Sequence, residues 1–439
     1  MLYLIAPVVA SVLSCIALYP GIFSIDSLTQ LEQAMGKVPY NAWHPVGHTL
    51  LFFTIPYQLT GQILSVTVAH LLLYCFTWAY LFYTLERLGF KRRWLLVIQT
   101  LIVFIPTHLF LSMSMWKDIP FTCAGVILTA NLIRLKCDPS RLQKAGFLLG
   151  TGAALGLLTV MRHNGPIIAP MIALLFLLSY RKDWRKALVP IGTAAVLFAS
   201  VQFVGFTLLH AKPNPSAVSY RWFTQIAAGI LKDGGRASQD DLDKLAAIMP
   251  LEEWTGRYNP YLNDPLFMVD IPGYKVTDTV EAHKGELVSA TLSLSLKNPL
   301  KAVNAELRVT ELTWRVLPLG PVNVTSYINR LDAYGLQIKQ DTPLFSVWHD
   351  AMETMRTDYV LSVFFTRHGL WFCLTVFLLC LAFLRRSRRA LVCFAPVLLN
   401  VMSLWVSIPS QDYRYVYLTV FAFPLLAGMM FNKKGETTT

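Results

Sequence analysis

The stretch AGFLLGTGAALGLLTVMRHNGPIIAPMIALLFLLSYRKDWRK, residues 145–186, decides the fold. Two apolar runs are separated by the short polar turn RHNGP and followed by the basic cluster RKDWRK. An apolar run of roughly 17 to 25 residues is long enough to span a bilayer. An excess of Lys and Arg marks the cytoplasmic side of a membrane protein. The pattern therefore predicts a pair of spans with RHNGP outside and RKDWRK inside.

Runs of this kind recur along the whole chain of 439 residues, which is 54% hydrophobic and only 15% charged. Such a composition excludes a disordered chain and a disulfide-stapled one. Because backbone polar groups must be paired inside a bilayer, the repeated apolar runs indicate helices. We expect an all-α polytopic membrane protein with about ten transmembrane helices, near 3–23, 61–85, 94–111, 119–134, 145–161, 166–180, 187–209, 368–384, 390–408 and 415–431.

Basic residues are concentrated in alternate loops. Of the 38 Lys and Arg residues, 18 fall on one side, and this excess accounts for the net charge of +12. Since Lys and Arg are retained in the cytoplasm, both termini are expected there, and a nucleic-acid partner is not expected. The inner residues are Arg87, Lys91, Arg92, Arg93, Arg134, Lys136, Arg141, Lys144, Arg181, Lys182, Arg185, Lys186, Arg385, Arg386, Arg388, Arg389, Lys433 and Lys434.

The spans divide the chain into three expected domains. Residues 1–209 form an N-terminal transmembrane module of seven spans with a first outer loop at 24–60, and 366–439 form a C-terminal module of three spans. Residues 210–365 lie between them and form a mainly helical extracytoplasmic domain. This segment has no cysteine, so it depends on packing. A one-sided helical pattern from Gly285 to Val316, interrupted at Pro299, suits the membrane surface.

Polar side chains gather at the outer ends of the spans and are nearly absent from their middles. This distribution argues against an ion pathway through the bundle. Four outer segments that are distant in sequence therefore present acids, cations and aromatic rings at one membrane level, and they form the strongest functional signal. The segments are SIDSLTQLEQAMGKVPYNAWHPVGH (24–48), SMSMWKDIPF (112–121), MRHNGP (161–166) and SQDYRY (410–415).

Each charged residue in these segments also has a structural interpretation. Asp26 and Asp118 stand at expected helix starts, where an Asp side chain caps the helix, and capping does not exclude a catalytic role. Lys117, Arg162 and Arg414 suit anchors at the membrane interface. Because each of these cations stands beside Asp, His or an aromatic residue, they are equally candidates for a lipid phosphate.

A metal site is not favoured. His44 and His48 have the i, i+4 spacing of a metal pair, but Pro45 follows His44 where a zinc-protease helix has Glu. Substrate contact or ordinary packing is the preferred interpretation of His44. No cofactor is expected. Binding of a divalent metal ion is an alternative that the sequence does not favour.

The motifs resemble the GT-C superfamily of membrane glycosyltransferases that use polyprenyl-phosphate-linked sugars. They are PGIFSIDSLTQ, YNAWHPVGHTLLF, MWKDIPF and DYRY, and the nearest resemblance is to bacterial O-antigen and surface-glycan glucosyltransferases. The resemblance implies a GT-C fold. It also implies that Asp26 acts as base or positions the acceptor, and that Asp118 is a second catalytic acid. Several relatives bind a divalent ion with paired acids, whereas this chain has Lys117 before Asp118.

The expected activity is transfer of a sugar, glucose being one candidate, from a polyprenyl-phosphate donor to a cell-surface glycan or lipid-linked acceptor. In this hypothesis Asp26 is the base of an inverting displacement, and Lys117, Arg162 and Arg414 hold the departing phosphate. The sugar and acceptor contacts are assigned to Tyr40, Trp43, His44, Trp116, His163 and Asp412.

The expected location is the bacterial cytoplasmic membrane, with the active site facing the periplasm. The alternative is a flippase or transporter of a lipid-linked sugar, in which the same outer charges bind the head group. Transporters more often have broken helices with polar groups near the midplane. Transfer from donor to acceptor is the assay that separates the two classes.

Overall fold

The computed structural model describes residues 1–268, 270–271, 274–317, 320, 322, 331–385 and 387–432. The predicted inner residues Arg386, Lys433 and Lys434 lie outside these ranges. Within them the helices are accompanied by loops and by one antiparallel pair of two-residue strands, β1 (Asp270–Ile271) and β2 (Tyr274–Lys275). The fold is that of an all-α membrane protein.

All ten apolar runs are helical. Among the described residues, three helical segments are long and apolar enough to cross a membrane, and two bent helix pairs raise the number to five. Five shorter apolar helices, of 10 to 17 residues, account for the other runs. Ten spans and their sidedness therefore stay a prediction.

The chain forms two compact units. The first consists of residues 1–212, 324–400 and 414–439. Its helices are α1 (Ile5–Ala17), α2 (Ile25–Ala34), α3 (Val46–His48), α4 (Ile55–Thr60), α5 (Leu64–Arg87), α6 (Arg92–Val103), α7 (Pro106–Met113), α8 (Asp118–Cys137), α9 (Ala145–Met161), α10 (Gly165–Ser179), α11 (Trp184–Gln202), α20 (Pro343–Thr357), α21 (Tyr359–Phe365), α22 (Gly369–Leu384), α23 (Arg388–Cys393), most of α24 (Ala395–Leu404) and α25 (Tyr417–Phe431).

The second unit consists of residues 213–323 and 401–413. Trp254, Phe267 and Leu287 are fully buried in its own apolar core. Its helices are α12 (Arg221–Lys232), α13 (Gln239–Ala246), α14 (Leu251–Gly256), α15 (Asp264–Phe267), α16 (Val276–Ala282), α17 (Lys284–Lys297), α18 (Pro299–Val309) and α19 (Glu311–Trp314).

This division differs from the three expected domains. The expected outer domain, 210–365, is split, because residues 331–365 belong to the first unit. In exchange, residues 401–413 join the second unit, where the Gln411 amide accepts from the Leu312 backbone N–H at 2.7 Å and donates to the Val309 carbonyl at 2.6 Å. These bonds connect positions about a hundred residues apart, so no local sequence pattern signals them.

Two sequence-based helix predictions have different outcomes. The interruption at Pro299 is confirmed, since α17 ends at Lys297 and α18 begins at Pro299. The single span expected over 94–111 stays a prediction, because α6 and α7 meet at an angle of 69° and form either a broken span or a re-entrant loop. Pro106 lacks the backbone N–H that would continue α6 and disfavours a helical conformation at Ile105, so a new helix starts there.

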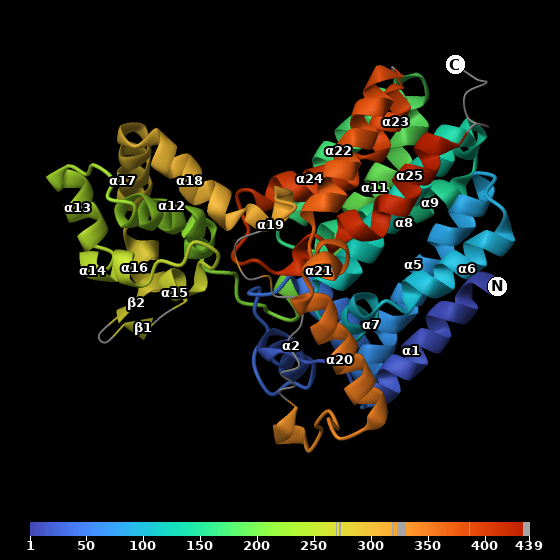
Figure 1. Cartoon of the computed structure of the whole chain (residues 1–439), viewed down its shortest axis with the longest axis horizontal. Helices are drawn as coiled ribbons and strands as arrows, with labels where there is room; N and C mark the ends of the chain where they lie inside the picture. The colour runs from blue at the N-terminus through green and yellow to red at the C-terminus, as the bar shows by residue number, and fades with distance from the viewer. Residues whose placement is uncertain are drawn as a thin grey trace. The chain divides into compact units, whose positions relative to one another are not determined.

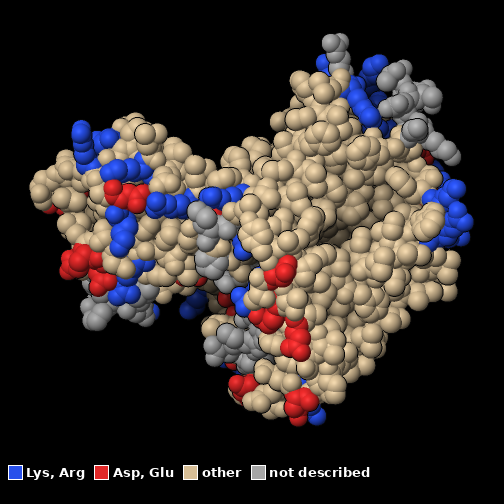
Figure 2. Space-filling model, in the orientation of Figure 1, with Lys and Arg blue, Asp and Glu red and all other residues tan. Residues whose placement is uncertain are grey.

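The helices α1, α5, α6 and α7 pack side by side in the first unit (Figure 1). In Figure 2, Lys and Arg gather near the α5–α6 turn and near the α22–α23 turn, and the wide surface between these turns carries few charges. This distribution is the one that a bilayer favours, because charged side chains stay in water while apolar side chains face hydrocarbon.

Candidate active site

Two distant loops are fixed to each other at the base of the candidate site. The backbone N–H of Ile22 donates to the Met113 carbonyl at 2.8 Å, and that of Met115 donates to the Ile22 carbonyl at 3.1 Å. The Trp116 indole N–H donates to the Ser24 hydroxyl at 3.1 Å. These bonds place the segment that carries Asp26 beside the segment that carries Lys117 and Asp118.

Asp26 lies in the first turn of α2 and does not cap it. The cap is Ser24, whose hydroxyl accepts from the backbone N–H of Ser27 at 3.5 Å. The alternative interpretation of Asp26 as a helix cap is therefore wrong, because α2 starts at Ile25 and Asp26 lies inside it. The Asp26 side chain is 41% exposed, so its carboxylate is accessible to a substrate hydroxyl.

Lys117 and Asp26 flank the ring of His44 on opposite sides. The Lys117 ammonium lies 3.4 Å from His44 Nδ1, and Asp26 Oδ1 lies 3.8 Å from His44 Nε2. An ammonium only donates, so Nδ1 is the acceptor, and in the neutral ring Nε2 then carries the proton and faces Asp26. His44 is only 3% exposed, which makes it a fixed spacer between the cation and the carboxylate.

Burial keeps His44 neutral. Desolvation, aided by Lys117, lowers the pKa of His44 to about 3. Desolvation also lowers the pKa of the Lys117 ammonium, while the nearby Asp118 and Asp26 carboxylates oppose that shift. His44 therefore carries no charge near pH 7, and the charges around it are those of Lys117 and Asp26.

This burial predicts a pH dependence of stability. An unfolded histidine has a pKa of about 6.5, so between that value and about 3 the unfolded state binds one proton more than the folded state. Stability is fully present above pH 6.5 and falls as the pH decreases through this window, by at most about 1.4 kcal/mol per pH unit.

We expect His44→Gln to remove this contribution. Thermal unfolding in detergent at pH 7.5, 6.5 and 5.5 should show a steeper loss of Tm for the wild-type protein than for the variant. Equal slopes for the two proteins would contradict a buried neutral His44.

Asp118 is held between two arginines. Its Oδ1 lies 3.1 Å from Nε of Arg162, and its Oδ2 lies 3.7 Å from Nε of Arg414. Asp118 is 1% exposed and Arg162 is 8% exposed. The carboxylate is therefore unavailable to solvent and orients the two guanidinium groups, which leaves the cluster with a net positive charge.

Aromatic rings and one amide hold the same arginines. Arg414 lies over the ring of Trp116 at 4.3 Å, and Arg162 lies over the ring of Tyr415 at 5.2 Å. Arg162 also donates to the Asn400 amide oxygen at 3.5 Å. Planar guanidinium groups stacked in this way present their remaining N–H donors in fixed directions.

The four outer segments thus converge through side-chain contacts, but the proposed sugar ligands do not all join them. His163 accompanies Arg162, and its ring lies 3.0 Å from the Trp43 carbonyl oxygen. The Tyr40 hydroxyl instead contacts the Thr54 hydroxyl at 3.1 Å. Asp412 belongs to the second compact unit. The roles assigned to Tyr40 and Asp412 stay predictions.

His44 and His48 do not face a common point. His48 lies 2.7 Å from Gln30 and 3.1 Å from His70, both through its ring nitrogens. Within the described residues, no group of three His, Cys, Asp or Glu side chains is placed to hold a metal ion. Near His44 the third neighbour is an ammonium, and Asp118 is already occupied by two arginines, so this donor set does not fit a divalent cation.

Sequence reasoning assigned no role to three residues of the site. Ser24 connects the two loops, Tyr415 stacks on both arginines, and Asn400 contacts Arg162 and donates to the Tyr415 carbonyl at 3.1 Å. The sequence does offer a sign that Asn400 is important, because it is a lone amide inside an apolar run and buried amides need hydrogen-bond partners. No sequence feature singles out Ser24 except its position before an expected helix.

The chain is similar to one archaeal enzyme of known structure. That structure is described as "Archaeal oligosaccharyltransferase AglB from Archaeoglobus fulgidus in complex with an inhibitory peptide and a dolichol-phosphate". The sequence identity is 13% and the TM-score is 0.41, over 98% of this chain and 50% of that chain. This chain therefore spans about half the length of the archaeal one.

No curated protein matches the sequence. A family model does match, over residues 58–439, which include Lys117, Asp118, Arg162 and Arg414 but not Asp26 or His44. The match covers well over half of the chain. The protein therefore belongs to the family described as "Family of unknown function (DUF6020)".

Proposed function

We propose that this protein is a membrane glycosyltransferase. It transfers a sugar from a polyprenyl-phosphate donor to a surface glycan or lipid-linked acceptor at the outer face of a bacterial cytoplasmic membrane. The observation that carries the proposal is the accessible Asp26 carboxylate beside a cluster of Lys117, Arg162 and Arg414 that Asp118 organises.

The proposed reaction uses one base and several cations. The acceptor hydroxyl attacks the anomeric carbon and loses its proton to the Asp26 carboxylate, while the bond from that carbon to the phosphate oxygen breaks. The electron pair leaves with the lipid phosphate, and Lys117, Arg162 and Arg414 stabilise its developing charge. In-line attack inverts the anomeric configuration.

The other site residues have supporting roles in this proposal. Because Asp118 is 1% exposed, it positions the arginines and does not contact the substrate. His44 keeps Lys117 and Asp26 apart, so that the base is not neutralised by a direct ion pair. Trp43, Trp116, His163, Tyr40 and Asp412 remain candidates for sugar or acceptor contacts. We route no step through a metal ion, because the donor set does not fit one.

The proposal is tested by transfer in detergent from radiolabelled polyprenyl-phosphate sugars to an envelope glycan fraction. Product formation that depends on both lipid donor and acceptor supports it. Movement of the intact donor across proteoliposomes without any transfer would contradict it and would favour a flippase.

Lys117→Met is expected to weaken donor binding. A charged hydrogen bond contributes about 1.5–3 kcal/mol, so the Kd for polyprenyl phosphate should rise roughly 10- to 100-fold. Lys37→Met is the matched control, since Lys37 is a lysine of the first outer loop that lies over the Tyr334 ring at 4.1 Å and not beside His44. Equal affinities for the two variants would exclude Lys117 from the phosphate site.

A further inference from the structure

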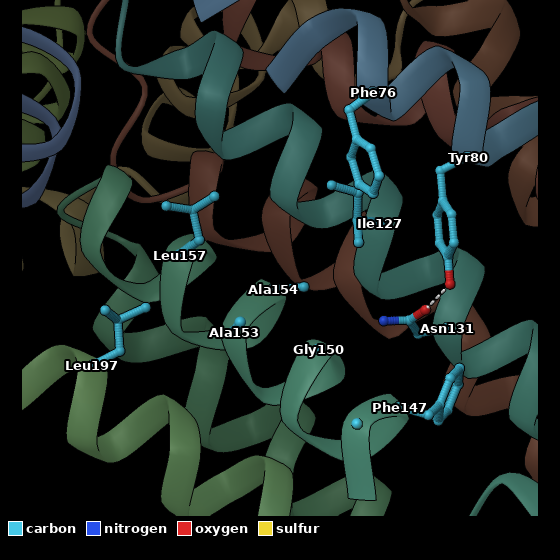
Figure 3. A pocket seen from close by; sticks show the side chains of 11 residues that line it. Phe76, Tyr80, Ile127, Asn131, Phe147, Gly150, Ala153, Ala154, Leu157 and Leu197 are labelled. Carbon is cyan, nitrogen blue, oxygen red and sulfur yellow. Dashed lines mark hydrogen bonds between the residues drawn. The ribbon is translucent and has the colours of Figure 1, made fainter. Parts of the chain in front are cut away.

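A groove runs along one side of α9, away from the candidate active site. It has a volume of about 480 Å³ and is lined by side chains from α5, α8, α9 and α11 (Figure 3). The segments containing α5, α8 and α11 are those that are long and apolar enough to cross a membrane. Phe76 of α5 is 50% exposed along this groove. Its open side therefore faces lipid hydrocarbon.

The floor of the groove is made by glycines that no protein contact requires. A Cβ added to Gly146 or Gly150 would meet no atom within 4 Å. On the α11 side of α9 the situation is opposite, because a Cβ on Gly152 would lie 2.5 Å from Thr193 and one on Gly156 would lie 2.8 Å from Leu197. Glycine in a helix costs about 1 kcal/mol relative to alanine. Close packing against α11 explains why Gly152 and Gly156 are glycines. No such packing explains Gly146 and Gly150, whose missing side chains leave a channel open.

A buried amide points into this channel. Asn131 is 4% exposed, and its oxygen accepts from the Tyr80 hydroxyl. Its amide nitrogen points into the groove (Figure 3) and has no acceptor among the residues that the structure describes. An N–H that faces hydrocarbon instead of water lacks an acceptor, at a cost of about 1–3 kcal/mol, so the groove favours an occupant with a hydrogen-bond acceptor at this depth.

An arginine contacts two of the residues that line the groove, Tyr80 and Phe147. The Arg134 guanidinium donates to the Tyr80 hydroxyl and lies over the rings of Tyr80 at 5.2 Å and Phe147 at 5.7 Å. No carboxylate in the described part of the chain forms an ion pair with it. Its remaining N–H donors suit a phosphate. Along α8, Arg134 follows Asn131 by three positions, a rise of about 4.5 Å.

We propose that this groove binds a glycerophospholipid of the membrane leaflet on the Arg134 side. The phosphate lies on Arg134, an ester carbonyl accepts from the Asn131 amide, and one acyl chain lies over Gly146, Gly150 and Ala153. A polyprenyl phosphate offers the phosphate and the apolar chain but no carbonyl near the phosphate. The acyl lipid therefore satisfies every polar group of the groove. This site does not depend on the proposed transferase activity.

The proposal is tested by native mass spectrometry of the intact protein in detergent with phosphatidylglycerol and polyprenyl phosphate in equal amounts. Gly150→Leu fills the channel. Gly192→Leu is the matched control, because a Cβ on this α11 glycine also meets no atom within 4 Å. We expect one phosphatidylglycerol per chain in the wild-type protein and in Gly192→Leu, and at least tenfold lower occupancy in Gly150→Leu. Unchanged occupancy in Gly150→Leu, or preferential retention of polyprenyl phosphate, would overturn the proposal.

A second variant covers the case in which Gly150→Leu does not fold. Arg134→Gln should lower phosphatidylglycerol occupancy about tenfold while leaving binding of uncharged diacylglycerol unchanged. Arg185→Gln is its control, since Arg185 is another inner basic residue stacked on an aromatic ring, that of Trp184 at 5.6 Å. Full retention of phosphatidylglycerol by Arg134→Gln would show that Arg134 does not bind the lipid phosphate, and it would overturn the proposal.

Discussion

Asp26→Asn is expected to lower the rate of sugar transfer by a factor of about 10² to 10⁴, the range that general base catalysis contributes. The Asn amide has the size of the Asp carboxylate, but it cannot take the proton from the hydroxyl of the sugar acceptor. The fold should survive, because Ser24 caps α2 and the Asp26 side chain is 41% exposed. Initial rates with saturating donor and the Kd for polyprenyl phosphate are the two measurements.

Glu32→Gln is the matched control for this variant. Glu32 lies on the same helix, and its carboxylate accepts from the Tyr334 hydroxyl at 3.3 Å, so the wild-type rate is expected. A folded Asp26→Asn protein with the wild-type rate would refute the base assignment. Loss of donor binding together with the rate would instead assign Asp26 to binding.

Asp118→Asn is expected to have the largest effect on stability. It removes the carboxylate charge that pairs with Nε of Arg162, and Arg162 is only 8% exposed. Removing one partner of a buried ion pair costs about 3–5 kcal/mol. A clear decrease of the apparent Tm in detergent should therefore accompany loss of transfer. The arginines are then no longer oriented toward one phosphate.

Two further variants separate charge loss from general damage. Asp183→Asn removes an exposed carboxylate that pairs with Lys186 at 3.7 Å, and little change in Tm is expected, since such surface pairs contribute little. The double variant Asp118→Asn/Arg162→Gln should be less destabilised than the sum of its two single changes, because the unpaired cation is gone. Strict additivity of the two changes would show that Asp118 and Arg162 are not coupled.

Sequence reasoning predicts the members of the site better than their arrangement. Lys117, Asp118, Arg162 and Arg414 are charges at the predicted outer ends of spans that carry few charges, and polarity alone predicts them at one membrane level. Their order around Asp118 depends on contacts between helices, which a pattern of polarity does not contain. The role of Tyr40 as a sugar contact stays a prediction, because the residue type alone suggests it and its hydroxyl contacts Thr54.

The same distinction applies to the fold. Apolar length identifies the ten helical runs, and the proline at position 299 correctly marks a helix start. The bend before Pro106 is missed because hydropathy does not change across it. The membership of residues 401–413 in the second unit is missed because backbone and amide bonds to α18 and α19 leave no periodic trace in the sequence.

Gln411 sets a constraint on the order of biosynthesis. The second unit includes residues 401–413, and Gln411 of that segment bonds to Leu312 and Val309. A ribosome produces this segment only after α20 to α23 have been made. The second unit therefore cannot finish folding as its first hundred residues emerge, and its completion coincides with insertion of the last helices. Truncation before residue 401 would leave the second unit incompletely closed even though all of 213–323 had been synthesised.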